Sequence, residues 1–213
     1  MLCRGTRLCK DLFGPGKDKT HFLIFDHWGV VEYHGAKQRE VEISQSKPLM
    51  QRLFETRLQL AQESLQKGEV DLFELLANWI VQTINQLNDK TIAVRDKWRE
   101  KRQLGDLDTI RQFSPNTVTA LETEIAPLMQ WIDVRGYSDA YQFDLLMTQT
   151  IQAKLNNTNQ FNDLRSDVIH WLHNLQMRLN QVRAKADIIK QARELSFWDD
   201  AGLIELEEAR VNL

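Results

Sequence analysis

Residues 70–87 read VDLFELLANWIVQTINQL, and this stretch decides the fold. Its apolar residues recur at alternating steps of three and four, which is typical of an amphipathic helix that buries one face. The apolar seam continues past this stretch and comprises Val70, Phe73, Ala77, Ile80, Ile84, Leu87, Thr91, Val94 and Trp98. Asn88-Asp89 is the one point where the pattern predicts an interruption, because both side chains compete for backbone hydrogen bonds.

Similar apolar spacing predicts helices on both sides of this stretch. Ser46 is the expected cap of the preceding helix, and Gly68 its expected end. The polar run 156–159 predicts a break, and Ser196 is expected to cap a last helix. The expected helices therefore cover 46–68, 70–98, 118–132, 141–155, 161–189 and 196–213.

The first 35 residues have a different composition, since they hold five of the nine glycines. Within this region, 20–26 reads THFLIFD, which predicts a buried strand, and 30–33 predicts a second one. One or two strands cannot satisfy their backbone groups without further strands beside them. We therefore expect a mainly α fold, in which a helical domain at 41–213 follows a short α/β remnant at 1–40.

Composition bounds the function in several ways. The hydrophobic content of 42% argues against intrinsic disorder. The chain has 27 Lys and Arg residues and 30 Asp and Glu residues, and this balance argues against a wholly basic nucleic-acid-binding domain. No apolar run approaches the roughly 18 residues of a membrane span, so no membrane association is expected. Cys3 and Cys9 cannot form a disulfide framework, which favours a reducing, cytoplasmic location.

Two arginines near the N-terminus are the first candidates for chemistry. Arg4 and Arg7 stand three residues apart with Gly5 between them, so both guanidinium groups can point at one anion. A permanently charged, forked guanidinium is what an arginine finger requires. An Arg-x-x-Arg pair on a solvated surface is the alternative. The later run GPGKDKT, residues 14–20, does not have the spacing of a phosphate-binding loop.

A second candidate is a cluster of five cations within eight residues around Trp98, which comprises Arg95, Lys97, Arg99, Lys101 and Arg102. Clustered cations can follow a DNA backbone or contact a partner protein. Asp96 and Glu100 dilute the cluster, so a solvated helix face is the alternative. His170 and His173 are spaced for a shared metal but have no evident third ligand, so no metal site is expected.

Several segments resemble one family of DNA motors. At the N-terminus they are MLCRGTRLC (1–9), DLFGPGKDK (11–19) and the strand that ends at Phe25-Asp26. Further along they are WIDVRG (131–136), FDLL (143–146), LNQVRAKA (179–186) and FW (197–198). Together they are similar to the last helicase motif and the C-terminal helical region of the motor (restriction) subunit of type I restriction-modification enzymes, within superfamily 2 of the DEAD/DEAH-type helicases.

The resemblance implies an ATP-dependent subunit that translocates and cuts DNA together with modification and specificity subunits. It implies that 1–40 is the end of the second RecA-like motor lobe, in which Arg4 and Arg7 reach the ATP phosphates and Gly5 permits close approach. It also implies that 41–213 docks on the partner subunits, which bring double-stranded DNA to the complex. Cys3 is a departure, because the family normally has glycine there.

The remaining motor machinery has no counterpart in this sequence. A Walker A motif, an acidic box for magnesium and a nuclease centre are all missing from the 213 residues. ATP and magnesium are therefore expected as cofactors of the parent protein, whereas the chain alone is expected to bind neither and to be inactive. The alternative is a stand-alone helical protein-interaction module left from a truncated gene.

Overall fold

The computed structural model describes residues 10–11, 14–19, 47–176 and 180–213. The chain divides into two units, Met1–Ser46 and Lys47–Leu213. In the first unit, the backbone N–H of Gly16 donates to the Asp11 carboxylate at 2.6 Å. The strands expected at 20–26 and 30–33 lie outside the described residues, as does most of the motor-lobe remnant expected at 1–40.

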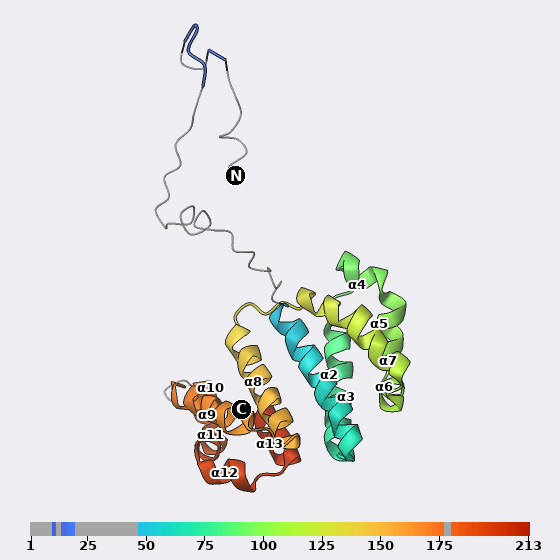
Figure 1. The fold of residues 1–213 in the computed structure, drawn as a ribbon, viewed down its shortest axis with the longest axis vertical. Helices are drawn as coiled ribbons and strands as arrows, with labels where there is room; N and C mark the ends of the chain where they lie inside the picture. The colour runs from blue at the N-terminus through green and yellow to red at the C-terminus, as the bar shows by residue number, and fades with distance from the viewer. Residues whose placement is uncertain (1–9, 12–13, 20–46, 177–179) are drawn as a thin grey trace. The chain divides into compact units, whose positions relative to one another are not determined.

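The second unit is built of helices (Figure 1), so the mainly α class is confirmed. Most are α-helices, with one π-helix (η2) and one 3₁₀ helix (η3) between α7 and α8. In chain order the elements are α2 (Leu49–Lys67), α3 (Val70–Gln86), α4 (Ile92–Asp96), α5 (Trp98–Leu104), α6 (Leu107–Gln112), α7 (Pro115–Ala120), η2 (Leu121–Ile125), η3 (Ala126–Trp131), α8 (Ser138–Leu155), α9 (Gln160–His173), α10 (Asn180–Ala184), α11 (Ala186–Arg193), α12 (Leu195–Asp200) and α13 (Leu203–Asn212).

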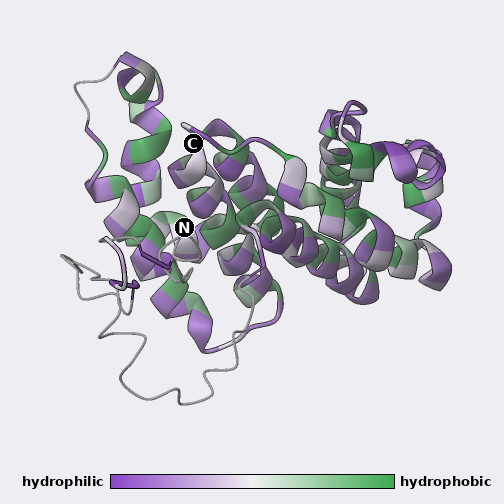
Figure 2. Ribbon diagram, turned by 90° about the horizontal axis from the view of Figure 1, so that it is seen from above, coloured by the Kyte–Doolittle hydropathy of each residue, from purple (hydrophilic) through white to green (hydrophobic). Residues whose placement is uncertain are grey.

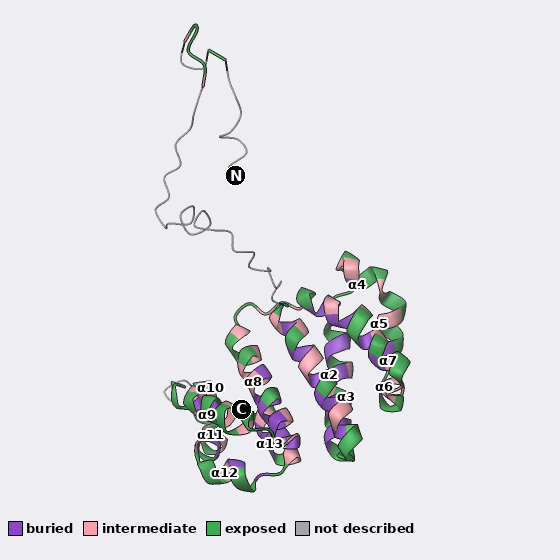
Figure 3. Cartoon of the chain, in the orientation of Figure 1, coloured by how far each residue is buried: buried purple, intermediate pink, exposed green. Residues whose placement is uncertain are grey.

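The core lies where α2 packs against α3, α8 and η3, while α13 packs on α3 and α8. Leu53 and Phe54 of α2 and Ile80 of α3 are fully buried. Figure 3 shows buried residues concentrated on the facing sides of these helices, and Figure 2 shows their apolar stripes beside polar outer faces. Each fully buried side chain of this kind contributes about 1.5–3 kcal/mol of transfer free energy, so the packed stripes hold the unit together.

Short turns set the order of these helices. Gly68 ends α2 as expected, with φ 78°, a left-handed conformation that glycine adopts without steric cost. Its backbone N–H donates to the Leu65 carbonyl, and the N–H of Glu69 donates to the Ser64 carbonyl. The chain therefore reverses within two residues, and α3 lies beside α2 (Figure 1). At the other end of α2 the N-cap is Pro48, whereas the expected cap, Ser46, lies outside the described residues.

The seam predicted for 70–98 is correct only in its first part. The expected interruption at Asn88-Asp89 is present, because α3 ends at Gln86 and α4 begins at Ile92. Past it, the chain leaves helical geometry at Lys97, with φ −108° and ψ 28°. This break changes the direction of the next helix, so Trp98 is 52% exposed rather than part of the apolar seam.

The helix predicted for 118–132 is a continuous helical path of three types, α7, η2 and η3. Pro127 explains the change, because its ring removes an N–H and clashes with the carbonyl four residues earlier in an α-helix. A π-turn followed by a 3₁₀ segment accommodates it.

The single helix predicted for 161–189 is wrong. The structure has α9, α10 and α11 instead, with α9 capped at Asn174 and a further break at Lys185. The guanidinium of Arg193 donates to the Leu172 carbonyl at 2.7 Å, so α11 folds back onto the end of α9. Tertiary contacts thus override a periodic pattern that reads as one helix.

The cap predicted at Ser196 is also wrong, because this residue lies inside α12. The final helix, α13, begins after Gly202, whose backbone N–H donates to the Glu205 carboxylate at 2.7 Å. None of the helices in the described ranges combines the length and apolar character needed to cross a membrane.

Candidate functional site

The predicted site residues fall in two regions of the chain. Arg4, Gly5 and Arg7, the expected nucleotide-binding residues, lie outside the described residues. The five cations predicted to contact DNA or a partner lie on α4, on α5 and at Lys97 between them. The structure therefore describes the second set alone.

Two of the five cations, Lys97 and Lys101, form ion pairs or hydrogen bonds with other residues of the helical unit. Lys97 forms an ion pair with Glu124 of η2, and this hydrogen-bonded pair raises the pKa of Lys97 and lowers the pKa of Glu124. Lys101 donates to the Leu87 carbonyl at 2.7 Å and to the Asp89 carboxylate at 2.6 Å. These two lysines have structural partners, which leaves them less available to an external anion.

The other three cations, Arg95, Arg99 and Arg102, are exposed. Among the described residues, no carboxylate forms an ion pair with any of them. The Arg99 guanidinium carbon lies 5.3 Å from the ring centroid of exposed Trp98. The structure thus divides the predicted cluster into two anchoring lysines and three outward arginines.

A buried network of four charges is the most constrained polar feature of the helical unit. Arg57 of α2 donates from Nη1 to Glu207 and from Nη2 to Asp144, each at 3.0 Å. Arg210 donates to Asp144 at 2.5 Å, and its Nε and Nη2 donate to Glu207 at 2.9 Å. The network therefore connects α2, α8 and α13.

Charges balance within this network, with two guanidinium groups facing two carboxylates. Burial by itself raises the pKa of Glu207, but the charges of Arg57 and Arg210 outweigh it and lower that pKa below its ordinary value. Burial lowers the pKa of Arg57 despite its two carboxylate partners. Burial opposes the charge of Arg210 too, yet hydrogen bonding to Glu207 leaves its pKa raised. Each charge in the network therefore lies within hydrogen-bonding distance of an opposite charge.

A pocket of about 600 Å³ opens directly beside the network. Its walls come from α3, α8, α9 and α13, from Leu175 and Leu213 after α9 and α13, and from Lys185 between α10 and α11. The lining residues are Trp79, Gln82, Asp139, Ala140, Tyr141, Phe143, Asp144, Trp171, Leu172, Leu175, Lys185, Arg210, Val211 and Leu213. Asp144 and Arg210 belong both to the lining and to the network, so the network positions one wall of the pocket.

Aromatic side chains make up much of the remaining wall. The rings of Phe143 and Trp171 lie 6.0 Å apart at 52°, a tilted packing. Trp79 has the Arg57 guanidinium 4.5 Å from its ring centroid, which fixes the ring by a cation–π contact. All three aromatic residues are half-buried. The pocket therefore presents preformed apolar surface with a few charged groups, as binding sites for ligands and for anchoring side chains do.

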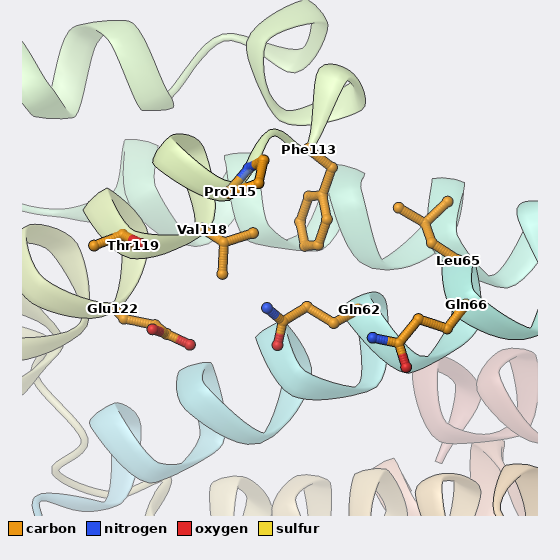
Figure 4. A pocket seen from close by; sticks show the side chains of 8 residues that line it. All are labelled: Gln62, Leu65, Gln66, Phe113, Pro115, Val118, Thr119 and Glu122. Atoms are coloured by element: carbon orange, nitrogen blue, oxygen red, sulfur yellow. The ribbon is translucent and has the colours of Figure 1, made fainter.

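A shallower hollow lies between α2 and the segment around α7, with a volume of about 460 Å³ (Figure 4). Gln62 and Gln66 project from α2 toward Phe113 and Val118 on the opposite wall. Phe113 has φ 39°, unusual for a residue with a side chain, and packs edge-on against Phe73. Glu122 is the one carboxylate in this lining, so the hollow holds no pair of carboxylates for acid–base chemistry.

Metal-binding side chains do not converge in the part of the chain that the structure describes. In that part, no group of three or more His, Cys, Asp or Glu residues is placed to hold a metal ion. His170 instead shares a hydrogen bond with Asn174 at 3.1 Å, and His173 is exposed.

Sequence reasoning missed the charge network. Its signal is a charged residue within an apolar stripe: Arg57 follows Leu53 and precedes Ala61 on the buried face of α2. Glu207 likewise stands beside Leu206 on α13. A charge at such a position usually has a buried partner, but a stripe does not indicate which distant residue supplies it.

Comparisons of this chain with protein-family models, curated proteins and solved structures found no match. Phe143 and Asp144, from segment 143–146, and Lys185, from segment 179–186, lie in the wall of the larger pocket. The resemblance of these two segments to a restriction motor subunit stays a prediction.

Proposed function

We propose that the chain is the C-terminal part of the ATP-dependent DNA-translocating subunit of a type I restriction-modification system. In this proposal, residues 41–213 dock the motor on the modification and specificity subunits, which bring double-stranded DNA. Arg4 and Arg7 contribute to the ATP site of the complete motor, to which ATP and magnesium belong.

One observation carries the docking part of the proposal. Segments 143–146 and 179–186, quoted above for their resemblance to the restriction subunit, are far apart in sequence, yet Phe143 and Asp144 of the first and Lys185 of the second line the same pocket. Phe143, Trp171 and Trp79 give this pocket half-buried aromatic surface. Aromatic anchors in preformed pockets are the typical energetic centres of protein interfaces.

The charge network adds rigidity to the proposed docking site. Arg57 contacts Trp79 on one side and Asp144 on the other, so two wall residues are held by one buried guanidinium. A wall that is already ordered loses little conformational entropy when a partner binds. The network therefore supports a binding role for the pocket.

The alternative is a stand-alone helical protein-interaction module. It is favoured by one observation, namely that Lys47–Leu213 forms a compact unit with its own core. Both candidates predict that the pocket binds a protein. They differ in the partner, because the first candidate requires modification and specificity subunits encoded in the same genome.

The test is a pull-down of the purified modification–specificity complex by the chain, followed by titration of variants. We expect the Trp171→Ala variant to bind at least about 30-fold more weakly, as loss of a hot-spot aromatic residue does. The matched control is Trp131→Ala, which removes a tryptophan that is 52% exposed and outside the pocket. Absence of binding, or equal losses in both variants, would contradict the proposed docking site.

A further inference from the structure

The outward side of α5 combines positive charge with an exposed aromatic ring. With 3.6 residues per helical turn, Trp98, Arg99 and Arg102 fall within an arc of about 100° on this helix. Arg95 lies near the end of α4, three residues before Trp98 and on the other side of the break at Lys97, and its side chain is also exposed. The opposite side faces the body, where Leu104 is buried. We refer to Arg95, Trp98, Arg99 and Arg102 as the Arg-Trp face.

This face differs from an ordinary solvated helix surface in its charge pairing. Lys97 and Lys101, which lie beside the face, have carboxylate partners in Glu124 and Asp89. The three arginines are exposed, and no ion pair joins them to a carboxylate of the described chain. The ion pairs of Lys97 and Lys101 hold α5 against the rest of the helical unit. The three arginines have no such partner among the described residues, so their positive charge is exposed to an external anion.

Trp98 gives the face a second chemical character. Its side chain is 52% exposed, which leaves a large apolar ring in water between positive charges. Alternating cations and exposed aromatic rings are how proteins bind single-stranded nucleic acid, with arginines on phosphates and rings against bases. In a duplex the base faces are stacked on one another, so an exposed ring gains nothing without unstacking them.

We propose that the Arg-Trp face binds single-stranded DNA directly, with Arg95, Arg99 and Arg102 on successive phosphates and Trp98 stacked on a base. The chain has a formal charge of −3, so the attraction depends on this local surface rather than on net charge. The inference goes beyond the proposed function, in which duplex DNA is reached through partner subunits. It uses none of the residues of the docking pocket.

The experiment measures binding of the full chain to a fluorescently labelled oligothymidine by anisotropy over a range of salt concentrations. Each phosphate contact on a single strand contributes about 0.7 to the slope of log K against log salt. The triple variant R95A/R99A/R102A should therefore lose about 2 from the slope and, at about 0.1 M salt, bind on the order of 100-fold more weakly.

A second variant tests the stacking contact separately. Trp98→Ala should bind about 5- to 150-fold more weakly, the effect of losing one stacked base, with little change in the salt slope. The charge-matched control is R52A/R183A/K190A, which removes three exposed cations from α2, α10 and α11. Circular dichroism of each variant checks that the helices remain intact.

Several outcomes would overturn the proposal. One is equal loss of affinity in the two triple variants, which would show binding by charge in general. Another is equal affinity for duplex and single strand with no effect of Trp98→Ala, which would leave phosphates as the sole contact. Absence of binding to any DNA at low salt would also refute it. All of these outcomes are independent of the docking test, because the pocket residues are unchanged.

Discussion

Replacement of Glu207 by glutamine removes one charge from the buried network while keeping the shape of the side chain. Glu207 accepts hydrogen bonds from Arg57 at 3.0 Å and from two nitrogens of Arg210 at 2.9 Å. In the variant, both guanidinium groups depend on Asp144, which is 17% exposed. The network then carries one uncompensated positive charge, and Arg57, which is fully buried, loses one of its two carboxylate partners.

Removal of one partner from a buried ion pair costs about 3–5 kcal/mol. Domains of this size are stable by about 5–15 kcal/mol in total, so the variant should lose a large share of its stability. Taking a urea dependence of about 2 kcal/mol per molar, the midpoint of unfolding should fall by about 1.5–2.5 M. Urea titration followed by helical circular dichroism measures this shift directly.

Two controls make the result specific. Asp133→Asn breaks the exposed pair in which Arg135 lies 2.6 Å from Asp133, and it should leave the midpoint almost unchanged. The double variant R57M/E207L removes one charge of each sign and leaves Asp144 paired with Arg210. It should therefore be more stable than the single variants R57M and E207L, each of which leaves one charge uncompensated. A shift below about 0.5 M in Glu207→Gln, or purely additive effects in the double variant, would refute the reasoning.

Further predictions concern pH, packing and ATP. The folded-state pKa of Glu207 lies below its unfolded value of 4.5, so the stabilising contribution of this carboxylate is present above pH 4.5 and declines as pH falls toward the folded pKa. Thermal melts of the unmodified chain should show this decline in stability. A Glu207→Gln variant with the same acid dependence would contradict it. Trp198 is fully buried and donates from Nε1 to the Ala192 carbonyl at 2.8 Å, so Trp198→Ala should cost about 3–5 kcal/mol in urea titrations, and a cost below about 1 kcal/mol would show that the site repacks. The purified chain should hydrolyse ATP no faster than its R4A/R7A variant, and a reproducible difference in a phosphate-release assay would oppose this expectation.

The sequence predicted the helices whose signals are local. For α2, the apolar stripe and the glycine at position 68 are sufficient to predict the helix and its C-terminal end. For α3, the prediction rests on an apolar seam without interruption. For α8, the predicted range 141–155 lies within the observed helix. In each case most of the residues that define the helix also bury it, with Val70 at the start of α3, 56% exposed, as an exception, so local preference and packing largely agree.

Other parts of the fold depend on residues that are distant in sequence. The chain breaks at Lys97, where the lysine forms an ion pair with Glu124, and it breaks after α9, where Arg193 reaches the Leu172 carbonyl. The periodicity of apolar residues does not indicate such contacts, because it describes spacing along a single segment. The effect of Pro127 on the helical path is local and could have been predicted from its position.

The candidate site was predictable to a smaller extent. The cation cluster is visible in the sequence, but its division into paired lysines and outward arginines requires the positions of Asp89 and Glu124. Arg57 and Glu207 are 150 residues apart, and no pattern in the sequence relates them. Pockets are formed by several elements together, so a single-segment pattern cannot outline them.

Competition for assembly tests the central claim most directly. A complete restriction subunit, together with its modification and specificity subunits, cleaves DNA in an ATP-dependent reaction according to the proposed function. An excess of the 213-residue chain should displace the complete subunit and inhibit cleavage, and the Trp171→Ala variant should inhibit much less than the Trp131→Ala variant. Undiminished cleavage at an excess of the unmodified chain would contradict the account.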